Sequence, residues 1–282
     1  MEPRHAMAPY SGAVAAATVG AFGTAARPAR LSLAEATSLT WVLAKKNFRV
    51  RYKHAFLGVL WAVLQPAFQA LVLAEVFSHV ITVGTGPHYP VYVLCGVLPW
   101  SFFSQALALQ TTSVLDNESL VKKVPLPLEI FPLAALGGTA IAFAASLSIL
   151  LIGGLAAGTL GVSLLLLPVA VALELALTAG LGFVVAALHP AFRDVRYIVE
   201  SLMLVIFYAT PVVYDPARVH GWIGTVIRAN PITGVLSLYR RAILNRPIDM
   251  RALLISLGAA VVLLALGAWL YRRRSPEFAD LV

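Results

Sequence analysis

The sequence predicts an all-α, polytopic membrane protein with six transmembrane helices. Of its 282 residues, 60% are hydrophobic and only 12% are charged, whereas soluble domains carry about 25% charged residues. Apolar runs also follow one another along the chain, and at about 1.5 Å per residue they are long enough to cross a hydrocarbon core of about 30 Å. This composition excludes an ordinary soluble protein, and nucleic acid is not among the partners that we expect.

The first residues are predicted to form a tail. Residues 1–30 are rich in Ala and Gly, and they contain no Leu that could drive the apolar region of a signal peptide. Glu2 also offsets Arg4 at the position where a signal peptide needs a positive charge. We therefore expect a disordered cytoplasmic tail rather than a cleaved leader.

A helix is predicted between this tail and the first span. Ser32 and Glu35 form the S-x-x-E pattern of a capping box, which predicts a helix that begins there and runs to about Val50. Its Lys and Arg side chains lie near Trp41 and other apolar residues, as in helices that rest in the headgroup layer. Residues 31–53 are therefore expected to form an amphipathic interfacial helix.

Six apolar runs are predicted to span the membrane within a transmembrane domain at 54–272, which a cytoplasmic tail at 273–282 follows. Their expected ranges are 56–80, 91–113, 130–157, 161–188, 196–213 and 252–271. An even number of spans places both termini on one side. The two short loops on the other side contain no Lys or Arg, which favours cytoplasmic termini, although the basic residues of the long fifth loop oppose this rule.

The fifth loop, 214–250, is predicted to carry a short helix. Asn230 and Pro231 suit an N-cap and the first helical position. Helical spacing places Arg240 at the edge of an apolar face and Arg241 opposite it; that face comprises Ile232, Val235, Leu236, Tyr239 and Ile243. About 13 residues are too few to span a bilayer, so we expect an interfacial or re-entrant helix before the last span.

Five stretches carry a family resemblance. They are RVRYKHAFLGVLWAVLQP at 49–66, VYVLCGVLPWSFFSQAL at 91–107, NESLVKKVPLPLEIFPLA at 117–134, HPAFRDVRYIVESLMLVIFYATPVVY at 189–214 and NPITGVLSLYRRAIL at 230–244. In this order they resemble the membrane (permease) subunits of ABC exporters for lipid-linked bacterial polysaccharides, the group that exports O-antigen, teichoic acid and galactan. The Ala-rich composition, with 16 Arg against 5 Lys, is typical of a GC-rich genome. Within the group, the chain resembles the actinobacterial galactan exporters.

The resemblance implies a channel-forming subunit in the bacterial cytoplasmic membrane. It implies a second copy of the chain and two ATP-binding cassette subunits as partners, with membrane lipid around them and a polyprenyl-diphosphate-linked glycan as the substrate. The chain has no G-x-x-x-x-G-K-[ST] motif to cradle phosphates. We therefore expect it not to be an enzyme and to hold no cofactor, with ATP and Mg²⁺ bound in the partner.

Basic residues supply the expected contacts outside the channel. Arg49, Arg51 and Lys53, the basic collar, have the chemistry to hold the substrate diphosphate, or else they only anchor the chain to anionic lipid. A coupling loop at 114–129 is expected to contact the ATPase through Lys122, Lys123 and Glu129, unless it is an ordinary positive-inside hairpin. In that loop Pro125-Leu126 and Leu128 stand where the family has an aromatic pair and an Arg. Tyr239, Arg240 and Arg241 are the expected gate residues, unless their helix has no gating role.

Aromatic side chains are the candidates for the channel lining, because their faces can stack on sugar C–H groups without binding them tightly. The alternative is that they serve only as interfacial anchors or in helix packing. The candidates are Trp61, Phe68, Trp100, Phe102, Phe103, Phe207 and Tyr208.

Acidic residues within the spans leave other functions open. Glu75, Glu174 and Glu200 would suit a proton-coupled secondary transporter of a smaller polar substrate, although the hydropathy shows no inverted repeat. We expect Glu174 to hydrogen-bond a neighbouring helix or to stay protonated. A membrane transferase is disfavoured because Asp194 stands without a second acidic residue and is expected to pair with its arginine neighbours. The one cysteine, Cys95, excludes an internal disulfide and fits a core position, and no metal site is expected.

Overall fold

The computed structural model describes residues 32–53, 56–79, 88–123 and 126–281, and these contain helices and turns without strands. The predicted tail at 1–30 lies outside the described residues. The helices are α2 Leu33–Tyr52, α3 Trp61–His79, α4 Tyr89–Thr112, α5 Glu118–Lys123, α6 Ile130–Ala156, α7 Leu167–Leu188, α8 Val195–Ala209, α9 Gly221–Ala229, α10 Pro231–Leu244, α11 Met250–Arg274 and α12 Phe278–Leu281. Short 3₁₀ turns are η1 Gly58–Leu60, η2 Leu115–Asn117, η3 Val162–Leu166, η4 Pro216–Arg218 and η5 Ser275–Glu277.

A helix lies at each of the six predicted spans, which confirms the all-α polytopic fold. In the described part of the chain, four segments are long and apolar enough to cross a membrane: Tyr89–Thr112, Ile130–Ala156, Val162–Leu188 and Met250–Leu281. The other two are shorter, because α3 is apolar over Trp61–Phe77 and α8 has 15 residues, fewer than the about 20 that a span needs. The count of six spans therefore stays a prediction.

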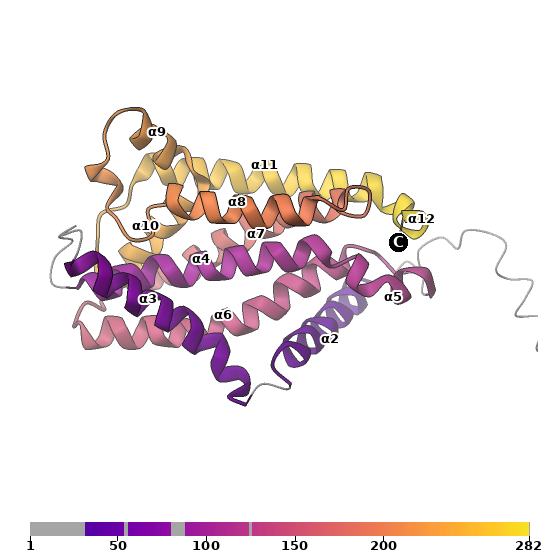
Figure 1. Ribbon diagram of the computed structural model, residues 1–282, viewed down its shortest axis with the longest axis horizontal. Coiled ribbons are helices and arrows are strands. Elements are labelled where there is room, and N and C mark those ends of the chain that lie inside the picture. The colour runs from indigo at the N-terminus through magenta and orange to yellow at the C-terminus, as the bar shows by residue number, and fades with distance from the viewer. Residues whose placement is uncertain (1–31, 54–55, 80–87, 124–125, 282) are drawn as a thin grey trace, which may run out of the picture.

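The long helices form one bundle around α4. Figure 1 shows α5 and α12 together at one end of the bundle and α9 at the opposite end. We call these the α5 end and the α9 end. Helix α4 contacts α3, α6, α7, α8 and α10, and its apolar side chains are buried on nearly every side, Cys95 among them. A helix that is apolar all round fits such a central place.

Close backbone approach joins α7 to α11. A Cβ added to Gly180 would lie 2.6 Å from the Leu263 backbone. A Cβ added to Gly267 would lie 2.3 Å from the Gly180 carbonyl oxygen. The two helices therefore touch where neither has a side chain, as membrane helices commonly do. Pro168 stands in the first turn of α7, a position at which proline begins a helix without kinking it.

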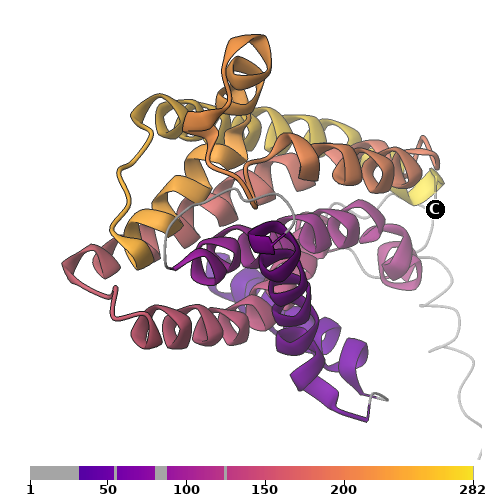
Figure 2. The same ribbon diagram turned by 60° about the vertical axis from the view of Figure 1, so that its left-hand side comes forward.

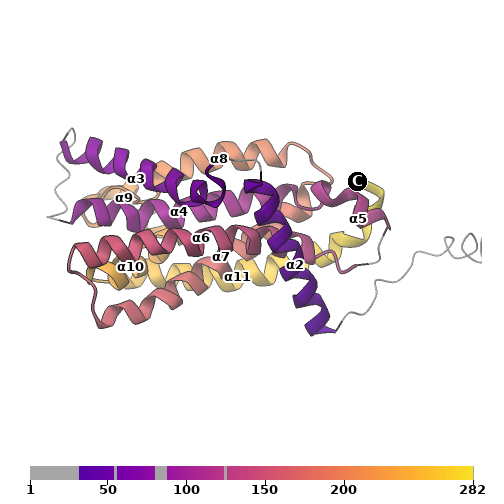
Figure 3. The same ribbon diagram turned by 90° about the horizontal axis from the view of Figure 1, so that it is seen from below.

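Helix α2 crosses the bundle obliquely, as Figure 3 shows. Its predicted capping box is confirmed, since the Glu35 amide donates to Ser32 Oγ at 3.2 Å and the Ser32 amide donates to Glu35 Oε2 at 2.8 Å. Ala44 is buried on α6, where a Cβ added at Gly138 would lie 3.0 Å from the Ala44 carbonyl oxygen. The exposed side of α2 carries its basic residues and Trp41.

Buried side chains form two separate apolar clusters. The larger one fills the bundle between α3, α4, α6, α7, α8, α10 and α11. The smaller one lies at the α5 end and comprises Leu43, Val114, Val121, Ile130, Phe131, Ala134, Phe183, Ala186, Ala187, Tyr271 and Phe278. This second cluster, the end cluster, joins α2 and α5 to the ends of α6, α7 and α11.

Candidate functional site

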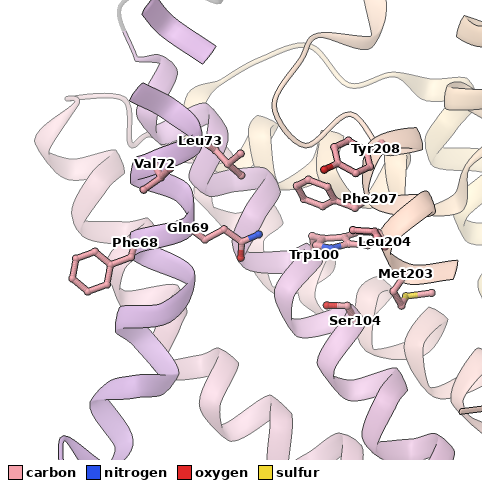
Figure 4. A pocket seen from close by; sticks show the side chains of 10 residues that line it. All are labelled: Phe68, Gln69, Val72, Leu73, Trp100, Ser104, Met203, Leu204, Phe207 and Tyr208. Carbon is pink, nitrogen blue, oxygen red and sulfur yellow. The ribbon is translucent and has the colours of Figure 1, made fainter. Parts of the chain in front are cut away.

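A groove of about 650 Å³ lies on the surface of α4, between α3 and α8. Figure 4 shows the side chains that line it: Phe68, Gln69, Val72 and Leu73 from α3, Trp100 and Ser104 from α4, and Met203, Leu204, Phe207 and Tyr208 from α8. Its long open side is bordered by exposed apolar residues of α3 and α8. The groove is therefore aromatic and apolar, with the Gln69 amide and the Ser104 hydroxyl as its uncharged polar groups.

Four of the predicted channel aromatics line this groove, and Figure 4 shows three of them together, Trp100, Phe207 and Tyr208, while the Phe68 ring points away from these three. The Trp100 ring lies edge-on to the Phe207 ring with centroids 5.6 Å apart, and the Phe207 ring is 5.4 Å from that of Tyr208. Trp100 is almost buried, whereas Phe68 and Tyr208 are 59% and 71% exposed. The exposed rings offer free faces to a ligand, and the buried ring holds the wall in place.

The other three predicted aromatics lie elsewhere. Trp61 and Phe102 border a narrow crevice between α3, α4 and α6. Phe102 is buried and stacks on Phe143 with centroids 4.6 Å apart, and Phe103 is buried against Trp100. In this chain Phe102 and Phe103 therefore pack the core.

Sequence reasoning missed the polar groups of the groove and Met203. The signal that could have found Gln69 and Ser104 is their position, since each is an uncharged hydrogen-bonding residue inside an apolar run beside a candidate aromatic. A search for aromatic residues alone passes over them.

The basic collar lies at the end of α2. Arg49, Arg51 and Lys53 are all exposed, and Arg51 Nη1 donates to Gln105 Oε1 of α4 at 3.3 Å. Gln105 precedes the end of α4 by about two turns, or about 10 Å along its axis. The collar thus reaches inward from the α5 end and remains open to an anionic ligand.

The predicted coupling loop contains a helix, α5. Lys122 and Lys123 are exposed as expected, and Lys122 Nζ lies 2.7 Å from Glu118 Oε1. The hydrogen bond and the charge of Lys122 hold the pKa of Glu118 below its usual range. Glu129, the last residue of the loop, pairs with Arg272 Nε at 3.3 Å. Pro125 lies outside the described residues.

Helix α10 is the short helix predicted in the fifth loop, and it lies inside the bundle. The Asn230 side chain accepts the Ile232 amide at 3.0 Å, which confirms the N-cap. The helix ends at Asn245, whose φ of 55° is left-handed. Its predicted apolar face is buried against α4, α7 and α11, so α10 is a re-entrant element and not a surface helix.

Arg240 does not lie at the edge of α10 as predicted. It is 5% exposed, and its Nη2 donates to the carbonyl oxygens of Pro211 at 2.5 Å and Val212 at 2.9 Å. Its guanidinium also lies 3.7 Å from the centre of the Tyr92 ring. Other elements cover this side of the helix, so Arg240 ties the chain after α8 to α4 and is not available to a ligand. Arg241 is partly exposed and donates to the Asn245 carbonyl oxygen.

Glu174 is buried on α7 and bonded to a neighbouring helix, as predicted. The Tyr239 hydroxyl of α10 donates to its Oε2 at 2.5 Å. Glu75 and Glu200 are exposed, and Glu200 accepts from Arg196 Nε at 2.9 Å. Arg196 therefore pairs with Glu200 rather than with Asp194, against expectation. Over the described ranges, no group of three or more His, Cys, Asp or Glu residues is placed to hold a metal ion.

Helix α9 stands away from the bundle at the α9 end, as Figure 2 shows. Trp222 on it is 76% exposed, and Arg228 donates to the Pro216 carbonyl oxygen at its base. The α9 end therefore combines a buried helix, α10, with a projecting one.

Comparisons with known proteins agree on one family. Residues 38–244 match the family model described as ABC-2 type transporter, a range that includes the groove, the collar, α5 and α10. The chain is 28% identical over 242 residues to the O-antigen export system permease protein RfbA of Myxococcus xanthus, with 84% of this chain and 93% of the relative covered. It is 24% identical to the protein of that name from Klebsiella pneumoniae, with 86% and 93% covered. It is also 24% identical to the polysialic acid transport protein KpsM of Escherichia coli, with 81% and 90% covered.

Proposed function

The chain belongs to the ABC-2 type transporter family, and from this premise we propose that it is the membrane permease subunit of an ATP-driven exporter of lipid-linked polysaccharide. The relatives named for O-antigen export and polysialic acid transport support the substrate class. The observation that carries the proposal is the aromatic groove, because its chemistry suits a sugar polymer. Galactan, with a polyprenyl diphosphate carrier, is our more specific proposal.

The groove is one half of a channel in this proposal. Its rings can stack on the C–H faces of sugars, while its uncharged polar groups bind hydroxyls only weakly, so a long polymer can slide through it. Because the groove is open along the sides of α3 and α8, a second copy of the chain would close it. The functional unit is therefore a homodimer.

ATP is handled by a different chain in this proposal. The sequence lacks a phosphate-binding loop, so two ATP-binding cassette subunits hold ATP and Mg²⁺. They dock at the α5 end, where Lys122, Lys123 and Glu129 lie, and this end faces the cytoplasm of the bacterial inner membrane. The α9 end then faces outward, and α10 with Tyr239, Arg240 and Arg241 forms the closed gate. Arg240 acts there as a structural tie.

The collar is the proposed site of the substrate diphosphate. The forked donors of Arg49 and Arg51 match phosphate oxygens, and Lys53 adds a point charge. Its place about 10 Å inward of the α5 end suits a lipid headgroup. Changing Arg49 and Arg51 to Gln should reduce export severalfold with the complex intact, whereas Lys45→Gln with Lys46→Gln on the same helix should have little effect. Equal export by both double variants would remove the collar from the proposal.

The proposal as a whole is tested by purifying the tagged chain from its native host. We expect a stoichiometric partner with a P-loop, and an ATPase activity that is lost when the Lys of that loop is changed. Export of lipid-linked glycan into vesicles is then measured for Phe68→Ala and Tyr208→Ala. Both should reduce export while complex formation is unchanged, because both rings are exposed in the groove.

The matched control for these variants is Tyr197→Ala. Tyr197 is an exposed tyrosine on the same helix as Tyr208 but outside the groove, so its loss should leave export near the wild-type rate. A chain that purifies alone without ATPase activity would contradict the exporter. A Tyr197 effect equal to that of Tyr208 would contradict the groove.

A further inference from the structure

The segment Tyr271–Leu281 folds back onto the α5 end of the bundle. Phe278, in the four-residue helix α12, is fully buried, and so is Tyr271 at the end of α11. The two rings lie edge-on with centroids 5.3 Å apart, and the Tyr271 ring lies 5.5 Å from that of Phe183 on α7. Terminal residues are ordered only where something ties them down, and here a buried aromatic ring does so.

Polar contacts tie the same segment to two loops, the one after α5 and the one after α7. The Tyr271 hydroxyl donates to the Leu128 carbonyl oxygen at 2.8 Å, and Arg272 Nε lies 3.3 Å from Glu129 Oε1. Both acceptors belong to the loop that connects α5 to α6. On the far side, Arg193 Nη2 donates to the Leu281 carbonyl oxygen at 3.3 Å. The segment therefore links the loop after α5 to the loop after α7.

Helix α5 depends on this support. It has six residues, and a helix of that length is not stable in water without tertiary packing. Val121 is its buried residue, and it belongs to the same end cluster as Phe278. Helices α12 and α5 are in contact and lie side by side in Figures 1 and 3. The exposed Glu118–Lys122 pair adds little to stability.

We propose that the segment Tyr271–Leu281 is a brace that positions α5 for the ATP-hydrolysing partner, with Phe278 as its central positioning residue. This inference rests on the proposed function, because it takes α5 as the docking element. A helix that is held firmly transmits the movement of the partner to the bundle. A loosely held helix shifts with the partner and leaves the bundle in place. The brace therefore affects how much glycan is exported for each ATP hydrolysed, rather than whether the complex forms.

The first test measures α5 in the permease alone. Phe278→Ala should raise amide hydrogen exchange of residues 118–123 by about tenfold, because local opening of a short helix depends on its contacts, while exchange within α4 and α7 stays unchanged. Phe278→Tyr, which keeps the ring, should restore most of the protection. The matched control is Leu281→Ala, since this side chain is partly exposed and outside the end cluster. Unchanged exchange in Phe278→Ala would overturn the brace.

A milder variant keeps the test decisive if Phe278→Ala does not fold. Arg193→Gln removes the donor to the Leu281 carbonyl oxygen without leaving a cavity. It should raise exchange of residues 118–123 by a smaller factor, with Arg196→Gln in the first turn of α8 as the control. Equal exchange in these two variants would also overturn the brace.

The second test uses the complex with its ATPase. Phe278→Ala should assemble normally and hydrolyse ATP, but the ratio of glycan exported to ATP hydrolysed should fall at least threefold, and Phe278→Tyr should restore it. A loosened α5 with an unchanged ratio would overturn the brace and leave the exporter intact. A wild-type chain that binds no ATPase would instead contradict the proposed function.

Discussion

At the scale of single residues, two buried polar side chains of α10 hold the α9 end together. Arg240 binds two carbonyl oxygens of the chain after α8 and rests on the Tyr92 ring. Tyr239 donates to Glu174 on α7. Both residues belong to the predicted gate, and both make contacts that must break if α10 moves out of the bundle. If α10 is the gate that we propose, its opening must break these contacts.

Removal of the Arg240 contacts should destabilise the protein. Arg240→Met keeps the length of the side chain but loses two charge-assisted hydrogen bonds and the ring contact, at a cost of about 3 kcal/mol. The midpoint of thermal unfolding in detergent should fall by several degrees. Arg241→Met is the control, because Arg241 is partly exposed and donates, among the described residues, to the Asn245 carbonyl oxygen at the end of its own helix. An equal shift in both variants would contradict a structural role for Arg240.

Glu174 separates the exporter from a proton-coupled transporter. Glu174→Gln keeps an acceptor for the Tyr239 hydroxyl but cannot ionise, so an exporter that uses this group only for packing should retain its export rate. Tyr239→Phe leaves the carboxyl group unpaired and should cost about 1–3 kcal/mol in stability. Loss of export in a folded Glu174→Gln variant would favour proton coupling.

At the scale of elements, the crossing of α2 over α6 sets the place of the collar. Gly138 allows the two backbones to touch at Ala44, and the collar lies further along α2. Gly138→Val should push α2 away, lowering both the unfolding midpoint and the export rate. Gly258→Val on α11 adds the same side chain where nothing lies within 4 Å of the new Cβ, and it should be nearly neutral. Disulfide cross-linking between cysteines placed on α2 and α6 would report the separation directly.

The sequence predicts elements better than it predicts their neighbours. The capping box of α2 and the N-cap of α10 are local signals, and the structure has both helices where these signals place them. Arg240 was misplaced because a helical wheel puts it only about 100° from Tyr239 and says nothing of the elements that cover it. Phe278 was missed for a related reason, since four helical residues carry no periodicity.

At the scale of the whole molecule, part of the candidate groove could be predicted from the sequence and part could not. Four residues of the groove could be predicted, because aromatic side chains within apolar runs suggest sugar stacking by residue type alone. Trp100 lies in the groove and Phe102 in the core because different faces of α4 meet α3, α6 and α8. Since this central helix is apolar on nearly every side, its sequence does not indicate which face lies against which helix. Gln69 and Ser104 were missed for another reason, because a search for aromatic side chains passes over polar residues.

A homodimer that closes the groove should form cross-links at its rim. Cys95 is buried, so single cysteines can be added without replacing it. Val76→Cys on α3 and Val205→Cys on α8, both exposed, should give disulfide-linked dimers under mild oxidation. Val262→Cys, equally exposed but on α11, should not. Dimers only from the α11 variant would place the interface on the other side of the bundle.

The buried position of Phe278 also bears on how the protein is handled in the laboratory. A reporter domain or purification handle fused after Val282 begins next to Leu281, whose carbonyl oxygen accepts from Arg193. If the segment Tyr271–Leu281 is the brace that we propose, a fusion that displaces it should lower the amount of glycan exported for each ATP hydrolysed. Handles are therefore better placed before residue 32, ahead of the first described helix.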